Sequence, residues 1–130
     1  MIDHVSLGVR CLDISTSFYE LVLGSLGYTK LVVRPLTVGF GKRYAEVWIN
    51  SRPQAKSVET DSGAHLCLRA GSPEQVEAFH HAALANGGVD DGAPGPREHD
   101  AADQTYYSAF VRDPDGNRIE AVCFVGAPSP

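Results

Sequence analysis

Asp3-His4-Val5-Ser6-Leu7-Gly8-Val9 and Ala64-His65-Leu66-Cys67-Leu68-Arg69 stand in the two halves of this chain, and in both a histidine is followed by alternating apolar residues. Alternation with a period of two is typical of a β-strand with one buried face. His4 and His65 then lie on the strand faces that are not apolar. A pattern that occurs twice predicts two copies of one structural unit.

A glutamate is repeated as well. Glu46 lies in Tyr44-Ala45-Glu46-Val47-Trp48-Ile49, and Glu120 lies in Arg118-Ile119-Glu120-Ala121-Val122. A carboxylate inside an apolar strand is costly to bury unless it is paired. A single strand histidine is more often a structural residue than a ligand, so the duplication carries the argument. The repeated residues predict one metal centre, with His4, Glu46, His65 and Glu120 as its ligands.

Two imidazoles and two carboxylates, without a thiolate, suit one borderline divalent ion such as Zn, Ni, Co, Mn or Fe. Such an ion can act as a Lewis acid and stabilise an enediolate while a neighbouring base removes a proton. Glu120 and Glu46 are the candidates for that catalytic base. Cys67 shares a strand face with His65 and is expected to line the site rather than to bind the ion.

The periodicity predicts one α+β domain over residues 1–130, built from two tandem βαβββ modules whose mixed sheets curl around a cavity. One face of each sheet is expected to be covered by a helix. Module 1 spans about 2–50, a polar linker follows at 51–61, and module 2 spans about 62–125. In module 1 the expected elements are a strand at 2–10, a helix at 13–25 with Asp13 as its N-cap, and strands at 28–34, 36–40 and 43–50.

Module 2 is expected to begin with a strand at 64–70. Ser72 is then the N-cap of a helix with proline at its first position, and the helix ends at Asn86-Gly87-Gly88. A loop rich in Gly, Pro and Asp follows at 89–104, and the last two strands are expected at 105–112 and 118–125. Between these strands, Asp113-Pro114-Asp115-Gly116-Asn117 is a strong turn signal.

Composition limits the classes of partner. A net charge of −5 argues against nucleic acid, and no apolar run is long enough to span a membrane. The three cysteines are odd in number and widely spaced, so we expect reduced thiols. With no signal peptide expected either, these features favour a cytoplasmic protein that binds a small molecule.

Several other side chains are candidates for binding that molecule. Trp48, Tyr106 and Tyr107 either line the cavity or simply pack. Arg97 lies with His99 in the Gly/Pro-rich loop, which is either a lid that contacts substrate or an ordinary surface loop.

With these motifs the chain resembles the vicinal oxygen chelate superfamily, which includes glyoxalase I, bleomycin-resistance proteins, fosfomycin-resistance enzymes and extradiol dioxygenases. The resemblance covers nearly the whole chain. It rests on Asp3-His4-Val5, on Ser17-Phe18-Tyr19 with the following Leu-Gly pairs, on Gly63-Ala64-His65-Leu66 and, most specifically, on 110–120 (Phe-Val-Arg-Asp-Pro-Asp-Gly-Asn-Arg-Ile-Glu). It implies the paired βαβββ fold, the four ligands named above and a homodimer.

The resemblance also indicates the reaction class. The full His/Glu/His/Glu set is similar to that of bacterial glyoxalase I and implies a metal-dependent glyoxalase-type lyase or isomerase that chelates a small oxygen-rich substrate. Gly8 departs from the arginine that glyoxalase I typically places there for a glutathione carboxylate, whereas Asn50 matches a glutathione-contacting position. An Fe(II) extradiol-type dioxygenase using His4, His65 and Glu120, and a non-enzymatic protein like those of bleomycin resistance, remain alternatives. The site could lie within one chain or across the dimer.

Overall fold

The computed structural model describes residues 1–98 and 104–126. Its first module contains one helix and four strands, in the expected βαβββ order. These elements are β1 (Val5–Val9), α1 (Leu12–Gly24), β2 (Thr29–Val33), β3 (Thr37–Gly41) and β4 (Ala45–Ser51). The strands form a mixed sheet in the order β1-β4-β3-β2, with β1 parallel to β4. His4, expected inside the first strand, lies just before it.

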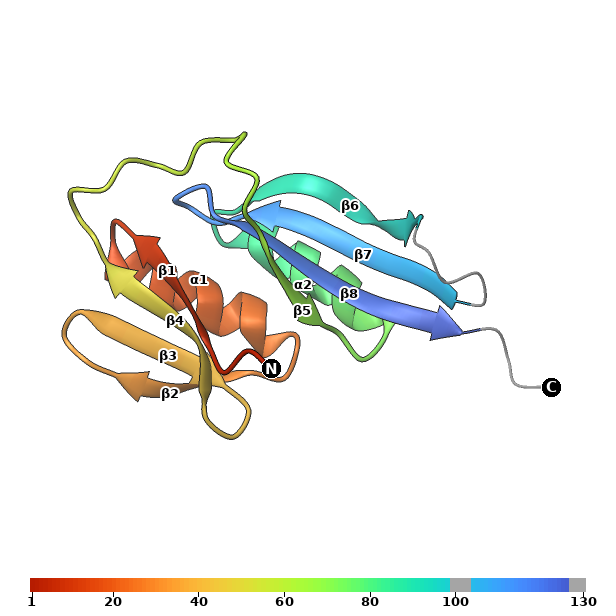
Figure 1. Ribbon diagram of the computed structural model, residues 1–130, viewed down its shortest axis with the longest axis horizontal. Coiled ribbons are helices and arrows are strands. Elements are labelled where there is room, and N and C mark those ends of the chain that lie inside the picture. Colours follow the sequence, from red (N-terminus) through yellow and green to blue (C-terminus); the bar gives the residue numbers. More distant parts are fainter. Residues whose placement is uncertain (99–103, 127–130) are drawn as a thin grey trace.

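The second module repeats this arrangement (Figure 1). Its sheet has the order β5-β8-β7-β6, with β5 parallel to β8. The fold class is therefore the one predicted, with two four-stranded sheets that do not close into a barrel. The elements are β5 (Leu66–Arg69), α2 (Pro73–Ala85), β6 (Val89–Arg97), β7 (Gln104–Arg112) and β8 (Arg118–Gly126).

The predicted loop at 89–104 is wrong over its first part, because Val89–Arg97 form strand β6. The segment carries two glycines and two prolines, which usually argue against a strand. Among the described strands, β6 lies at the sheet edge and pairs only with β7, so its other side needs no ladder of hydrogen bonds. The pairing is irregular, with register shifts on both sides of Gly92. An edge strand can therefore contain glycines and prolines that would weaken a central strand.

Helix ends follow the expectation in module 2 and depart from it in module 1. The Ser72 Oγ accepts a hydrogen bond from Gln75 N at 3.2 Å, as an N-cap should. In α1 the N-cap is Cys11, without a side-chain bond, and the predicted cap Asp13 lies inside the first turn. There its carboxylate still faces the positive end of the helix dipole.

The hydrophobic core lies between each sheet and its helix. Alternate strand residues such as Val47, Ile49, Ala109 and Val111 are buried against α1 or α2. The residues between them point to the opposite side, which no helix of the described chain covers, and we call this side the outer face. On it lie Ser6 and Gly8 of β1, Glu46, Trp48 and Asn50 of β4, Cys67 and Arg69 of β5, Tyr106 and Phe110 of β7, and Arg118 and Glu120 of β8.

The turn between β7 and β8 joins the two modules. Asp115 is 6% exposed and its Oδ1 accepts hydrogen bonds at 2.9 Å from both the backbone N and the Nε of Arg10. Asp113 is 2% exposed and accepts a hydrogen bond from the hydroxyl of Tyr19, from α1, at 2.6 Å. The sequence predicted a turn here. The structure shows that its two carboxylates also hold module 2 against module 1.

No helix in the described part of the chain is long and apolar enough to cross a membrane.

Candidate functional site

The best-defined part of the site lies on the outer face of module 2. His65 precedes β5, and its Nε2 is 3.0 Å from Oε1 of Glu120 on β8. The hydroxyl of Tyr106, on β7, donates to the other carboxylate oxygen at 2.5 Å. The Glu120 side chain is 3% exposed, whereas that of His65 is 36% exposed. A buried carboxylate thus has donors on both oxygens, while the imidazole beside it remains open to a ligand.

Cys67 borders this group and contacts it only weakly. Its Sγ lies 3.9 Å from the Tyr106 hydroxyl, and its Cα is opposite Glu120 in the β5–β8 pairing. Burial, followed by the nearby Glu120 charge, raises the pKa of the Cys67 thiol to about 12. Burial and the hydrogen bond to Glu120 likewise raise the pKa of Tyr106. Both groups therefore stay protonated at neutral pH, which is compatible with a lining role for Cys67.

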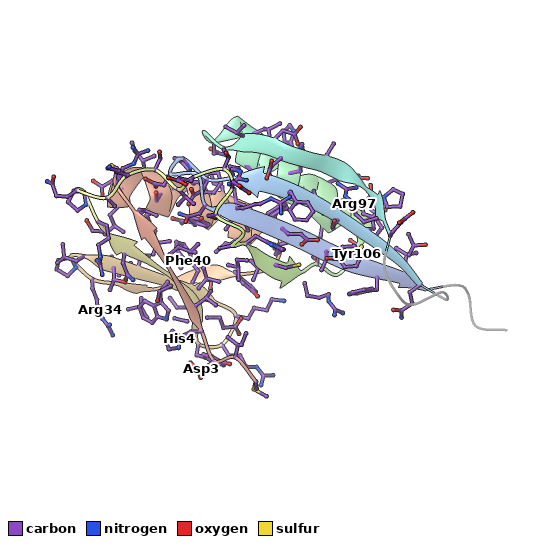
Figure 2. All side chains as sticks on the ribbon, turned by 45° about the horizontal axis from the view of Figure 1, so that its top comes forward. Asp3, His4, Arg34, Phe40, Arg97 and Tyr106 are labelled. Carbon is purple, nitrogen blue, oxygen red and sulfur yellow. The ribbon has the colours of Figure 1, made fainter. Side chains whose placement is uncertain are left out.

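Module 1 carries the other predicted pair. His4 and Glu46 line a hollow of about 320 Å³ that also receives Cys67 from module 2. Extending the β1–β4 register by one residue places His4 beside Glu46. The His4 side chain is 54% exposed, and its Nδ1 lies 2.7 Å from the Asp3 carboxylate (Figure 2). Burial, and then the Glu46 carboxylate, raise the pKa of Tyr28, which lines the same hollow.

The predicted substrate-binding residues of module 1 continue along the same face. Trp48 and Asn50 line a second hollow of about 240 Å³ together with His4 and Arg34. The Trp48 indole lies against Gly39, where a Cβ would come within 2.9 Å of Cζ3. The Asn50 Oδ1 accepts the Thr37 hydroxyl at 2.7 Å. Trp48 and Asn50 are thus both held in place from β3.

Tyr107 and Tyr106 face opposite sides of β7. The hydroxyl of Tyr107 donates to Glu77 of α2 at 3.0 Å, so this predicted substrate contact points away from the outer face. Tyr106 takes its place beside Glu120. The sequence contained this signal, because Tyr107 alternates in step with the apolar Ala109 and Val111.

The predicted lid residues are placed only in part. Arg97 pairs with Tyr106 across the β6–β7 ladder, and its guanidinium donates to the carbonyl oxygens of Ala93 and Pro96. His99 lies outside the described residues.

The two pairs are not equivalent copies. In module 1 His4 is opposite Glu46, whereas in module 2 Glu120 is opposite Cys67 and lies two residues beyond the partner of His65. Within residues 1–98 and 104–126, no three His, Cys, Asp or Glu side chains come close enough to hold a metal ion. One chain therefore presents two His–Glu pairs of the right donor chemistry, each on the outer face of its own module.

Known proteins share this architecture. The model of the family described as "Glyoxalase/Bleomycin resistance protein/Dioxygenase superfamily" matches residues 1–121. A glyoxalase/bleomycin resistance protein from Albidiferax ferrireducens T118 is 36% identical with a TM-score of 0.79, over 92% of this chain and 96% of that one.

Two more distant structures share the fold alone. The fosfomycin resistance protein FosX from Mesorhizobium loti is 16% identical with a TM-score of 0.65, over 98% of this chain and 93% of that one. A V278E mutant of glyoxalase I from Zea mays is 21% identical with a TM-score of 0.70, over 92% of this chain and 44% of that one. The family match, the related structure and the paired modules agree with the resemblance seen in the sequence, and the chain belongs to the glyoxalase/bleomycin resistance protein/dioxygenase superfamily.

Proposed function

We propose that this protein is a metal-dependent glyoxalase-type lyase or isomerase that acts on a small oxygen-rich substrate. The observation that carries the proposal is the His65–Glu120 pair, in which a buried carboxylate with a hydroxyl donor lies beside a half-open imidazole. Neutral imidazole and carboxylate are ligands that suit one divalent ion of the Zn, Ni, Co, Mn or Fe group. His4 and Glu46 would supply the remaining ligands.

We further propose that the complete ligand set comes from two chains. Each chain offers one His–Glu pair per module, and its described residues contain no group of three suitable side chains. Members of this superfamily often dimerise and bind small molecules. In a two-fold dimer, the outer face of module 1 in one protomer could meet that of module 2 in its partner, forming two identical sites. We therefore expect a homodimer.

The residues divide the chemical work between them. A bound divalent ion would polarise neighbouring substrate oxygens and stabilise an enediolate. Glu120 or Glu46 would take the substrate proton, since each is a carboxylate beside the oxygens that the ion would hold. Tyr106 keeps one oxygen of Glu120 engaged, which leaves the other directed to His65. Trp48 and Asn50 would contact the body of the substrate.

The metal content of a histidine variant tests the ligand assignment. In His65→Ala we expect loss of most of the bound ion with the fold intact, because the strands pack through the opposite face. His81→Ala is the matched control, since His81 is exposed on α2, away from the outer face. Atomic absorption on both dialysed variants measures the result. Full occupancy in His65→Ala would refute the assignment.

Mixing two inactive variants tests whether sites span two chains. His4→Ala and His65→Ala each break every site in their own homodimers. A mixed dimer combines the intact module 1 of one chain with the intact module 2 of the other and regains one site. After statistical exchange between closed two-fold dimers, about a quarter of all sites should recover metal and activity. If each site lies within one chain, mixing restores nothing.

Glutathione is not expected to be the cosubstrate. Gly8 lacks the carboxylate-binding arginine of glyoxalase I, and Arg10 cannot replace it because its Nε is bound to Asp115. On metallated protein we expect a kcat/KM for the methylglyoxal–glutathione hemithioacetal well below about 10⁶ M⁻¹s⁻¹, a value within the range of efficient enzymes. A higher value would identify the protein as an efficient glyoxalase I.

A further inference from the structure

The outer faces are rich in arginine although the chain as a whole is acidic. The net charge is −5, yet six of the eight arginines in the sequence belong to the outer faces or their rims. Strand alternation places four of them there. Arg34 lies over the Trp48 ring. The side chain of Arg52 lies beside Gly8, with its Cγ 3.7 Å from where a Cβ on that glycine would be. The four on strands are Arg69, Arg97, Arg112 and Arg118.

Arg69 is positioned for binding and not neutralised. It lies on the same face of β5 as Cys67, four residues after His65, and its guanidinium carbon lies 4.6 Å from the centre of the Phe124 ring. Among the described residues no carboxylate forms an ion pair with it. Arg118, which lies over Phe110, differs because Asp91 accepts its Nε at 2.6 Å. The charge of Arg118 is thus compensated within the protein, and that of Arg69 is not.

Arg34 has the same features on module 1. Its guanidinium carbon lies 5.4 Å from the centre of the Trp48 ring, and it lines the hollow that contains His4 and Asn50. No described carboxylate pairs with it either. An aromatic face holds a guanidinium flat and leaves its N–H edge free for the two oxygens of a carboxylate. Each module thus presents one oriented, uncompensated guanidinium beside its His–Glu pair.

We propose that the ligand of this site is an anion, a small molecule whose carboxylate is bound by Arg69 and Arg34 while its neighbouring oxygens lie at the His–Glu pairs. The proposal rests on the proposed function and adds the substrate class to it. It also disfavours a cationic group at Arg69 and Arg34, because the two guanidinium groups would repel it. Arg34 lies on the outer face of module 1 and Arg69 on that of module 2, beside the predicted metal ligands. A small molecule bound between the two outer faces therefore contacts both guanidinium groups.

The test compares two chelators that differ in one group. Malate and 2-hydroxybutyrate share an α-hydroxy acid, but malate carries a second carboxylate where the other has a methyl. Titration of the Co(II)-loaded protein, followed by visible absorption, should give a Kd for malate at least about tenfold lower, the factor that one charge-assisted contact provides. The double variant Arg34→Ala/Arg69→Ala should lose this preference, and Lys56→Ala, which removes one positive charge from the linker, should keep it.

Thermal unfolding of each variant verifies the fold, and Arg69→Lys, which keeps the charge without the planar group, should retain only part of the preference. A preference that survives in the double variant, or its absence in the parent, overturns the proposal. If the parent takes up no Co(II), the proposed function fails. The carboxylate-binding role of Arg69 and Arg34 is then tested on the metal-free protein. Succinate should then shift the arginine Nε–Hε resonances of Arg69 and Arg34 while butane-1,4-diamine does not, and unchanged resonances overturn it.

Discussion

Removing the hydroxyl of Tyr106 should weaken metal binding without removing a ligand. The hydroxyl donates to Oε2 of Glu120 at 2.5 Å, the length of a charge-assisted O–H···O⁻ bond. Tyr106→Phe keeps the ring and its edge contact with Phe124, whose centroid is 5.3 Å away. The change therefore removes the hydrogen bond to a carboxylate that is 3% exposed, together with the weak contact between the same hydroxyl and the Cys67 thiol.

The size of the effect follows from that burial. A hydrogen bond to a charged group contributes about 1.5–3 kcal/mol, which corresponds to roughly 10- to 150-fold in affinity. The hydrogen bond from Tyr106 to Glu120 forms both with and without the ion. It therefore affects the metal affinity only by orienting Oε1 of Glu120. Loss of partners that orient a ligand typically weakens metal affinity about 10- to 100-fold. We therefore expect the lower end, an increase of about tenfold in Kd for Co(II).

Competition titration of Co(II) with a chromophoric chelator measures this Kd. Tyr107→Phe is the control, because it deletes the same atoms at the next residue, where the hydroxyl binds Glu77 on the helix side. Its Kd should equal that of the parent. A Kd for Tyr106→Phe that equals the Kd of the parent would refute the orienting role. An equal loss in both would indicate a general weakening of the sheet.

Three further predictions concern stability and reactivity. Asp113→Ala leaves the buried Tyr19 hydroxyl without its acceptor and should lower the free energy of unfolding by about 1.5–3 kcal/mol, measured in urea. A loss under about 0.5 kcal/mol would contradict the role of this hydrogen bond in holding the two modules together. Burial and the Asp113 charge raise the pKa of Tyr19, so the unfolded chain releases this proton at a lower pH than the folded chain. The free energy of unfolding should therefore fall above about pH 10, and it should fall less steeply in Tyr19→Phe. Cys11 and Cys67 are both exposed, but with a pKa of about 12 the thiol of Cys67 in metal-free protein should react far more slowly with iodoacetamide at pH 8 than that of Cys11, and equal labelling by mass spectrometry would contradict this.

Strand alternation made most of the fold predictable. A period of two fixes which side chains share a face, so the helix-covered and outer faces follow from the sequence alone. Strand β6 was not predicted, because its glycines and prolines carry no periodic signal and are tolerated only at a sheet edge. The duplication itself contained the missing information, since a second βαβββ unit needs one more strand between α2 and β7.

The sequence predicts a set of candidate site residues but not the geometry in which they are arranged. Alternation placed Glu46 and Glu120 on the outer faces, but strand register depends on connections that the sequence does not resolve. The structure puts Cys67, and not His65, opposite Glu120. The contacts of Asp113 and Asp115 were also invisible, because they join residues about a hundred positions apart in the chain.

The two His–Glu pairs differ in how far the protein prepares them. Glu120 is buried and held by Tyr106 and His65, whereas His4 is more than half exposed and bonded only to its neighbour Asp3 among the described residues. A ligand group that is already ordered loses little entropy on binding. The module 2 pair is therefore the preformed half of the proposed site. The exposure of His4 leaves it accessible to whatever completes the site, and in the arrangement proposed above that is the module 2 pair of a second chain.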